Sequence, residues 1–258
     1  MNALDHLFTQ RKKDILNIYT TAGFPSLEST GDVMLALQES GTDIIELGIP
    51  YSDPVADGTV IQQSNMTALQ NGVSLEKIFA QLAAIKEQLR VPVVLMGYIN
   101  PVMQYGMERF CEQAASCGVA GVILPDLPMY EYEKYYAATF KKNGLKCIFL
   151  ISPSTGRERM KKADRLSGGF LYAVSSSSTT GSSNNTEDKL AYYRELVAVN
   201  FRNPVLIGFG IRDKKGFDEA SRYAAGAIIG SAFIDHIAKA ADVKSAVKEF
   251  VAKIRGRE

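Results

Sequence analysis

Eight short apolar runs, rich in β-branched residues, alternate with longer amphipathic segments along the whole chain. The runs begin near Ile15, Asp43, Val91, Val119, Leu145, Gly169, Asn203 and Gly226. They read as continuous apolar stretches, which is typical of parallel strands that are covered on both faces. The segments between them carry helix signals, such as Ser74 at an N-cap position. This alternation of strands and helices predicts an α/β fold.

The number of these units and the length of the chain together favour a closed barrel. Eight units in 258 residues agree with the roughly 250 residues of a typical eight-stranded barrel. We therefore predict a single (βα)8 TIM-barrel domain over residues 1–258. Its N-terminal helix would plug the bottom of the barrel with Leu4, Leu7 and Phe8. A doubly wound open sheet is the alternative that the pattern leaves open.

The spacing of the strand starts indicates where the functional loops lie. The second gap is 48 residues and the sixth is 34, whereas the other five are 23 to 28. Loops that follow the strands form the active face of such barrels. We therefore predict enlarged loops after strands two and six, and we expect the site there.

Composition removes several classes of function. The chain has 29 basic and 28 acidic residues and a net charge of +1, so it lacks the basic footprint of a protein that binds nucleic acid or a membrane surface. No stretch approaches the roughly 18 apolar residues of a membrane helix. Cys111, Cys117 and Cys147 have no paired spacing, so we expect neither a disulfide framework nor a metal site. A cytoplasmic protein is the prediction.

Glu46 lies inside an otherwise apolar strand, where a charge is costly unless it points into a polar pocket. One reading is a glutamate paired with a buried basic residue. No Lys or Arg occurs between Lys13 and Lys77, so a local partner is absent, although a distant one remains possible. We therefore favour a functional carboxylate.

Two more carboxylates, Asp53 and Asp57, follow in a loop that two prolines and two glycines make stiff. Either could instead cap the helix expected near Thr59, and a turn or interface role suits Asp53 equally well. Paired carboxylates suit a reaction that needs one proton carrier and one fixed anion. Glu46 and Asp57 are therefore the candidate catalytic pair.

Glycine turns follow the seventh and eighth strands. They read Gly208-Phe209-Gly210 and Gly230-Ser231. Glycine permits close backbone approach, and a helix N-terminus offers free N–H groups to an anion. Phosphate sites recur at this place in barrels. Residues 175–186 are small and polar and could be a linker, but their place after strand six favours a mobile lid.

The chain resembles the tryptophan synthase α-subunit family over nearly its full length. Residues 46–58 (ELGIPYSDPVADG) match the long signature of that family. Shorter matches lie at residues 21–25 (TAGFP), 97–101 (GYINP) and 125–128 (PDLP). The two glycine turns match its phosphate turns.

The resemblance implies a lyase that cleaves indole-3-glycerol phosphate to indole and glyceraldehyde 3-phosphate without metal or cofactor. Glu46 matches its general acid/base, and Asp57 matches the carboxylate that binds the indole N–H. The partner would be a β subunit that carries pyridoxal phosphate, in an α2β2 heterotetramer, with Asp53 and Asp126 at the interface.

The resemblance also assigns the rest of the site. The indole pocket would consist of Phe24, Tyr98, Ile123, Ile151, Tyr172 and Phe209. Lid and phosphate positions would be Thr180, Gly181, Gly210, Gly230 and Ser231. One departure is the lid sequence, where Ser178 and Thr179 replace the Gly and Val of many members.

Two other functions are weighed against the lyase. The first is a barrel without activity that serves as the allosteric partner of a β subunit, and the presence of both Glu46 and Asp57 argues against it. The second is an isomerase or synthase acting on another sugar phosphate through Lys or Cys chemistry. Only Lys146 and Cys147, at the start of strand five, could serve that chemistry from a predicted strand.

Overall fold

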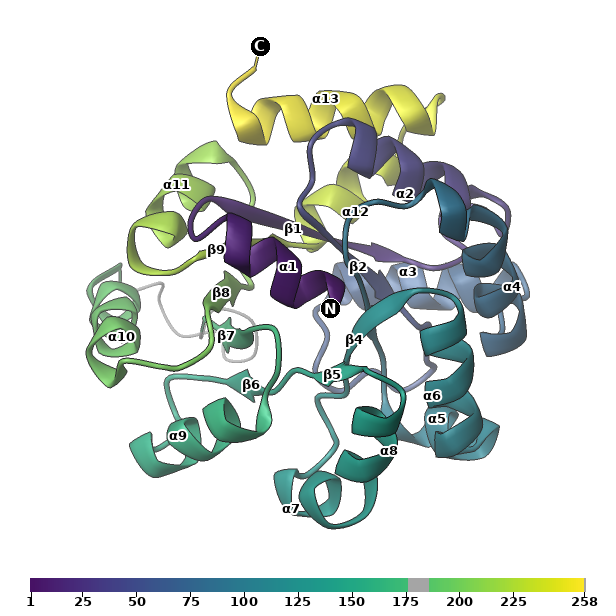
Figure 1. The fold of residues 1–258 in the computed structure, drawn as a ribbon. Coiled ribbons are helices and arrows are strands. Elements are labelled where there is room, and N and C mark those ends of the chain that lie inside the picture. The colour runs from purple at the N-terminus through teal and green to yellow at the C-terminus, as the bar shows by residue number, and fades with distance from the viewer. Residues whose placement is uncertain (176–185, 258) are drawn as a thin grey trace.

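The strands form one parallel sheet that curls on itself, with helices outside it (Figure 1). The computed structural model describes residues 1–175 and 186–257. The sheet order is β5-β4-β3-β2-β1-β9-β8-β7-β6. The strands are β1 (Ile15–Thr21), β2 (Ile44–Gly48), β3 (Val93–Met96), β4 (Val119–Ile123), β5 (Lys146–Cys147), β6 (Leu150–Ile151), β7 (Leu171–Val174), β8 (Val205–Gly208) and β9 (Gly226–Ile229).

The helices follow the strands along the chain and cover the outer face of the sheet (Figure 1). They are α1 (Ala3–Gln10), α2 (Ser29–Glu39), α3 (Thr59–Gln70), α4 (Leu75–Ile85), α5 (Ile99–Tyr105), α6 (Met107–Ser116), α7 (Met129–Glu131), α8 (Ala137–Lys142), α9 (Arg157–Leu166), α10 (Thr186–Val199), α11 (Lys214–Tyr223), α12 (Ser231–Ala238) and α13 (Val243–Arg255). Short helical turns add η1 (Lys86–Gln88) and η2 (Tyr132–Tyr136). Buried strands between covering helices confirm the predicted α/β barrel class.

The barrel closes through its fifth strand, which is split into β5 and β6. β5 pairs with β4, and the N–H of Ile148 continues that ladder to the carbonyl of Val122 at 3.0 Å. β6 pairs with β7, and the carbonyl of Phe149 accepts from Tyr172 at 3.1 Å. The prediction of one unbroken strand from Leu145 was therefore wrong: the two sides of this run pair over different residues, so neither ladder extends along all of it. The runner-up open sheet is not observed.

Helix α1 lies across the bottom of the barrel, as predicted (Figure 1). Leu4 is fully buried and Phe8 is nearly so, whereas Leu7 is partly buried against the core. The side chain of Leu4 packs on Gly121 and Gly169, where a Cβ would lie 3.2 Å and 2.8 Å from its Cδ1. Because these two glycines have no side chain, Leu4 of α1 can pack into the bottom of the barrel.

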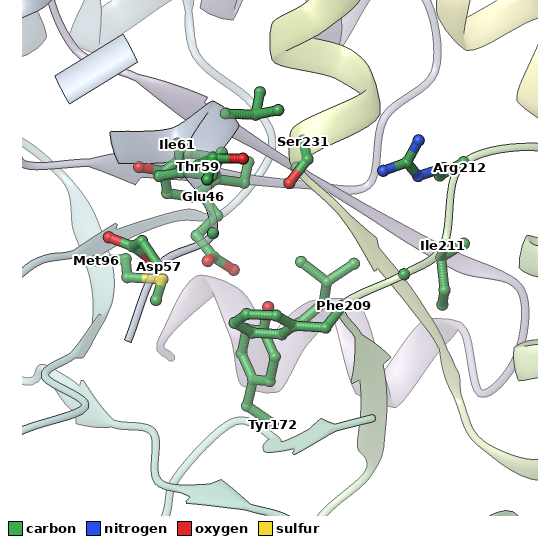
Figure 2. A pocket seen from close by; sticks show the side chains of 16 residues that line it. Glu46, Asp57, Thr59, Ile61, Met96, Tyr172, Phe209, Ile211, Arg212 and Ser231 are labelled. Atoms are coloured by element: carbon green, nitrogen blue, oxygen red, sulfur yellow. The ribbon is translucent and has the colours of Figure 1, made fainter. Parts of the chain in front are cut away.

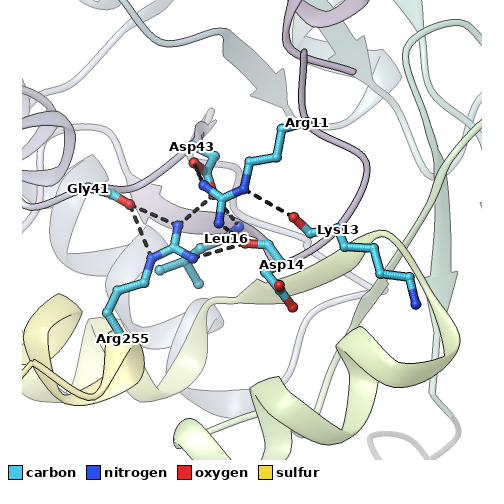
Figure 3. Close-up of polar contacts among 7 residues, drawn as sticks. All are labelled: Arg11, Lys13, Asp14, Leu16, Gly41, Asp43 and Arg255. Atoms are coloured by element: carbon cyan, nitrogen blue, oxygen red, sulfur yellow. Dashed lines mark hydrogen bonds and ion pairs between the residues drawn. The ribbon is translucent and has the colours of Figure 1, made fainter. Parts of the chain in front are cut away.

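Asp43 joins the two ends of the chain to the bottom of the barrel (Figure 3). Its carboxylate accepts from Arg11 at 2.7 Å, from Arg255 at 2.5 Å and from the backbone N–H of Leu16 at 2.8 Å. The two guanidinium groups also donate to the carbonyl of Asp14, each at 2.9 Å. The side chains of Asp43 and Arg255 are 12% and 8% exposed. We call these three charged residues, Arg11, Asp43 and Arg255, the terminal clasp.

Of the two loops predicted to be enlarged, the one after β2 belongs to the described residues, whereas most of the other does not. After β2, residues 49–58 form an irregular loop before α3, and a second helix, α4, follows in the same unit. The predicted lid after the sixth barrel strand, β7, lies almost entirely at residues 176–185, outside the described residues. The second-unit loop is therefore the one that positions the site described below.

Candidate active site

A cavity of about 280 Å³ opens at the carboxyl ends of the strands. Side chains from β1, β2, β3, β7 and β9 line it, together with the loops after β2 and β8 and the start of α12 (Figure 2). Its lining residues are Tyr19, Glu46, Asp57, Gly58, Thr59, Val60, Ile61, Met96, Tyr172, Phe209, Gly210, Ile211, Arg212, Ile228, Gly230 and Ser231. The predicted pair of carboxylates and the two glycine turns therefore meet in one place.

Glu46 is fully buried in β2 and points into this cavity (Figure 2). Its Oε2 accepts a hydrogen bond from Asn17 Nδ2 at 2.8 Å, while Oε1 has no hydrogen-bond partner among the described residues. Burial raises the pKa of Glu46 to about 8, and the nearby charge of Asp57 acts in the same direction. A carboxyl group with this pKa can both give and take a proton near neutral pH.

Two tyrosines stand beside Glu46, each over a glycine. A Cβ on Gly48 would lie 2.1 Å from the hydroxyl oxygen of Tyr19, and one on Gly208 would lie 2.5 Å from that of Tyr172. The two rings occupy the space that a Cβ at position 48 or 208 would need, so only glycine fits at these two positions. Burial raises the pKa of Tyr19 and of Tyr172 well above the usual value. Both therefore stay neutral and present hydroxyl groups to the cavity.

Asp57 lies in the loop after β2, and Tyr98 fixes its carboxylate. The hydroxyl of Tyr98 donates to Asp57 Oδ2 at 3.2 Å and accepts from the backbone N–H of Ala56 at 3.0 Å. Burial raises the pKa of Asp57 to about 6, against the lowering effect of the Tyr98 hydrogen bond. Helix α3 does begin at Thr59, but its N-cap is Gly58 without a side-chain bond. Asp57 is therefore not a helix cap, and it is ionised at neutral pH.

The glycine turns form the opposite end of the cavity. Phe209 and Gly210 both have positive φ, at 65° and 74°, a conformation that is uncommon for a phenylalanine. The hydroxyl of Ser175 donates to the carbonyl of Phe209 at 2.6 Å. The ring centroid of Phe209 lies 6.0 Å from that of Tyr172. Gly230 precedes helix α12, which begins at Ser231. This end therefore offers a helix N-terminus and a serine hydroxyl to an anion.

Arg212 lines the same end, and the sequence reasoning missed it. Its guanidinium extends toward the side of the cavity where Ser231 lies (Figure 2). Within residues 1–175 and 186–257, it has no hydrogen bond or ion pair, and the residue is exposed. The signal was available, because this residue directly follows the Gly208–Ile211 turn. Tyr19, Met96 and Ile228 were also missed, because they read as ordinary residues of apolar strands.

The predicted indole-pocket residues fall into two groups. Tyr172 and Phe209 line the cavity. Phe24, Tyr98, Ile123 and Ile151 are buried but do not belong to its lining. Of the predicted phosphate residues, Gly210, Gly230 and Ser231 line the cavity, whereas Thr180, Gly181 and the Ser178-Thr179 departure lie outside the described residues.

The two predicted interface carboxylates lie apart from the cavity. Asp53 is exposed, accepts from the Ser52 hydroxyl at 2.5 Å and lines a cleft with Tyr51 and Asn100. Asp126 accepts from the backbone N–H of Ile99 at 2.9 Å and 3.1 Å, and so holds the start of α5. Neither side chain contributes to the lining of the cavity that contains Glu46.

The lysine and cysteine of the competing isomerase hypothesis do not reach this cavity. Lys146 pairs with Asp5 at 2.7 Å, at the bottom of the barrel. Cys147 is buried, and burial raises the pKa of its thiol far above the usual value.

All three cysteines are buried free thiols. In the described part of the chain, no three His, Cys, Asp or Glu side chains gather as metal ligands, and none of the helices there is long and apolar enough to cross a membrane.

The family model and the relatives that match this chain all carry the same description. A family model described as "Tryptophan synthase alpha chain" matches residues 6–257. The tryptophan synthase alpha chain of Bacteroides thetaiotaomicron is 45% identical over 248 residues, which is 96% of this chain and 97% of the relative. That of Flavobacterium psychrophilum is 43% identical over 255 residues, which is 98% of this chain and 100% of the relative.

Solved structures agree with these relatives. Tryptophan synthase subunit alpha from Legionella pneumophila superposes with a TM-score of 0.90 at 34% identity, covering 99% of this chain and 98% of that one. A chain of the tryptophan synthase complex from Pyrococcus furiosus gives 0.84 at 33% identity, covering 95% and 99%. The similarity therefore spans sequence and fold over nearly the whole chain.

Proposed function

The chain belongs to the tryptophan synthase alpha chain family, and from that membership we propose how its cavity performs the family reaction. This reaction is the retro-aldol cleavage of indole-3-glycerol phosphate to indole and glyceraldehyde 3-phosphate. The observation that carries the assignment of roles is the buried carboxyl of Glu46, with its pKa raised to about 8, in the same cavity as the ionised carboxylate of Asp57.

Glu46 acts as the single general acid/base. In the resting enzyme it is protonated, because its pKa of about 8 lies above neutral pH, and it delivers this proton to indole C3. Its carboxylate then takes the proton of the hydroxyl on the carbon bonded to C3. The C–C bond breaks, its electron pair returns to the indole ring, and the hydroxyl-bearing carbon becomes the aldehyde of the product. Glu46 ends protonated, as it began.

Asp57 binds the indole N–H. Protonation at C3 places positive charge on the ring nitrogen, so an anion held there stabilises the intermediate more than the substrate. The hydrogen bond from Tyr98 orients this carboxylate. Tyr172 and Phe209, with ring centroids 6.0 Å apart, supply an aromatic wall for the indole ring.

The substrate phosphate binds at the opposite end, against Gly210, Gly230 and Ser231. Backbone N–H groups at the start of α12 and the Ser231 hydroxyl donate to it. Thr180 and Gly181 would add donors from the lid. General acid/base catalysis is worth about 10²–10⁴-fold, so orientation through this anchor supplies a further share of the rate.

The partner is a tryptophan synthase β subunit, in an α2β2 heterotetramer, and pyridoxal phosphate belongs to that partner. For this chain, the proposed chemistry uses side chains and backbone donors alone. The cleft lined by Asp53, Tyr51 and Asn100 adjoins the catalytic loop, and Val55 in that loop is 81% exposed. We place the partner on this surface together with Asp126. The buried free thiols support a cytoplasmic location.

Release of indole from indole-3-glycerol phosphate tests this function directly. The chain contains no Trp, so indole fluorescence can be followed with little background from the protein. We expect slow release by the isolated chain and marked acceleration with a β subunit. Absence of indole even with the β subunit present would reject the lyase and favour a barrel that serves only as an allosteric partner.

The rate of the isolated chain should have a bell-shaped pH dependence. Asp57 must be ionised, so activity is lost as pH falls through about 6; Glu46 must begin protonated, so activity is lost as pH rises through about 8. The measurement is kcat/KM from pH 5 to 10, with circular dichroism as the control for unfolding. The substrate phosphate also titrates near pH 6, so the alkaline limb is decisive. A rate that stays flat up to pH 10 would contradict the role of Glu46.

Arg212→Met should raise the KM for indole-3-glycerol phosphate about tenfold and leave kcat nearly unchanged. The guanidinium lines the phosphate end without a protein partner in the described ranges, so we expect it to pair with the substrate phosphate. Arg222→Met, which removes an exposed arginine in the last turn of α11, is the control. Equal KM values for the two variants would place Arg212 outside the phosphate site.

A further inference from the structure

Asn17 is the direct polar contact of the Glu46 carboxyl, and it comes from the neighbouring strand. Both residues are fully buried, and the amide Nδ2 donates to Glu46 Oε2 at 2.8 Å. In the β1–β2 register, Tyr19 lies opposite Glu46. Asn17 is two residues earlier in β1, so its side chain projects from the same face as that of Tyr19. The amide therefore approaches the carboxyl from deeper in the barrel, on the side away from the cavity mouth.

We propose that Asn17 is a positioning residue that holds the Glu46 carboxyl in both of its protonation states. This inference rests on the proposed function of Glu46. An amide carries a donor and an acceptor on one planar group, whereas a carboxyl group is only an acceptor when ionised and also a donor when protonated. The NH₂ of Asn17 satisfies the carboxylate. Rotation of the amide by about 180° presents its carbonyl to the protonated carboxyl instead.

Unpaired atoms on both partners support this role. Asn17 Oδ1 and Glu46 Oε1 are both buried without a hydrogen-bond partner in the described part of the chain. A buried carbonyl that makes no hydrogen bond is costly, so a purely structural purpose would be served better by an apolar residue. The free Oδ1 is the atom that the second protonation state requires, and no other described group uses it.

The other titratable groups that surround Glu46 keep their charge above pH 7. Tyr19 from β1 and Tyr172 from β7 stay neutral, because burial raises their pKa far above the working range. Asp57, from the loop after β2, titrates near 6. On the β3 side, the residue in register with Glu46 is the apolar Val94. Above pH 7, Glu46 is therefore the group near Asn17 that changes charge.

Asn17→Leu tests the proposal, because leucine has a similar size and makes no hydrogen bond. The bond that Asn17 makes to the charged carboxylate is stronger than the bond it makes to the neutral carboxyl, so removing both raises the pKa of Glu46. We expect the alkaline limb of kcat/KM to move up by about one to two pH units, kcat to fall about tenfold, and KM to stay within about threefold. A residue that only fills space would leave the alkaline limb in place.

Infrared titration gives a readout that does not depend on catalysis. The band of the protonated Glu46 carboxyl, assigned from its absence in Glu46→Gln, is followed between pH 6 and 10 in the wild type and in Asn17→Leu. We expect its midpoint to rise in the variant together with the kinetic limb. An unchanged midpoint overturns the proposal, as does a moved midpoint with unchanged kcat. Failure of the proposed function has a different signature, namely full turnover by Glu46→Gln.

A matched pair, Asn17→Val and Asn17→Thr, keeps the proposal testable if leucine prevents folding. The two replacements have nearly the same size and both suit a strand, but only threonine carries a hydroxyl that can donate and accept. We expect Thr to recover part of the turnover that Val loses and to move the alkaline limb back toward that of the wild type. Coincident pH profiles for the pair would show that packing alone matters at this position.

Discussion

Replacing Glu46 with glutamine should lower indole release by about 10²–10⁴-fold and leave substrate affinity within a few-fold. Glutamine has nearly the same shape and can still accept from Asn17, but it neither delivers a proton to C3 nor takes one from the hydroxyl. The measurements are single-turnover indole release and substrate binding by calorimetry. Glu39→Gln, an exposed glutamate at the end of α2, is the control. Comparable losses of turnover and of affinity would make Glu46 a binding or folding residue.

The same variant should be more stable than the wild type at alkaline pH. The pKa of Glu46 is raised from 4.5 to about 8 on folding, so the folded chain binds more protons than the unfolded chain between these values. Stability from this group is therefore present below pH 4.5 and is lost as pH rises through 8. Glutamine removes this dependence, and the gain near pH 8 is on the order of 4 kcal/mol. Thermal unfolding at several pH values measures it.

The two carboxylates of the proposed catalytic pair could be singled out because their chemistry conflicts with their surroundings in the sequence. A glutamate in an apolar strand and an aspartate in a proline-stiffened loop are unusual at those places whatever the fold, and both line the cavity. Tyr19 could not be recognised in the same way, because a tyrosine is ordinary in a strand. Its role depends on the register that places it opposite Glu46 and on the missing side chain of Gly48.

Asn17 was visible as a polar interruption of the first strand, but its meaning required the structure. Only the pairing of β1 with β2 shows that its amide reaches Glu46. The split of the fifth strand was hidden for a related reason. Its apolar run is continuous in sequence, and the break arises because residues 146–148 bond to β4 while residues 149–151 bond to β7. Short-range pattern predicts elements well, but partners across the sheet decide where each ladder ends.

The largest loss of stability should come from Asp43→Asn, which removes the negative charge of the terminal clasp. The guanidinium of Arg255, in a side chain only 8% exposed, then lacks its counter-charge. Breaking a buried ion pair on one side costs about 3–5 kcal/mol. For a domain of this size, this loss lowers the melting temperature by roughly 6–20 °C. Denaturant unfolding and calorimetry measure the loss, and activity at low temperature should persist because the clasp lies at the bottom of the barrel.

Two comparisons separate loss of the ion pair from a general effect of removing a charge. Asp218→Asn breaks the exposed ion pair with Lys214, in which the side chain of Asp218 is 45% exposed and that of Lys214 is 48% exposed. This substitution should cost less than about 1 kcal/mol. Adding Arg255→Met to Asp43→Asn should restore part of the stability, since no unpaired guanidinium then remains buried. If Asp43→Asn is as stable as Asp218→Asn, the clasp does not hold the chain ends. If the double variant is no more stable than Asp43→Asn, the penalty does not arise from the unpaired charge of Arg255.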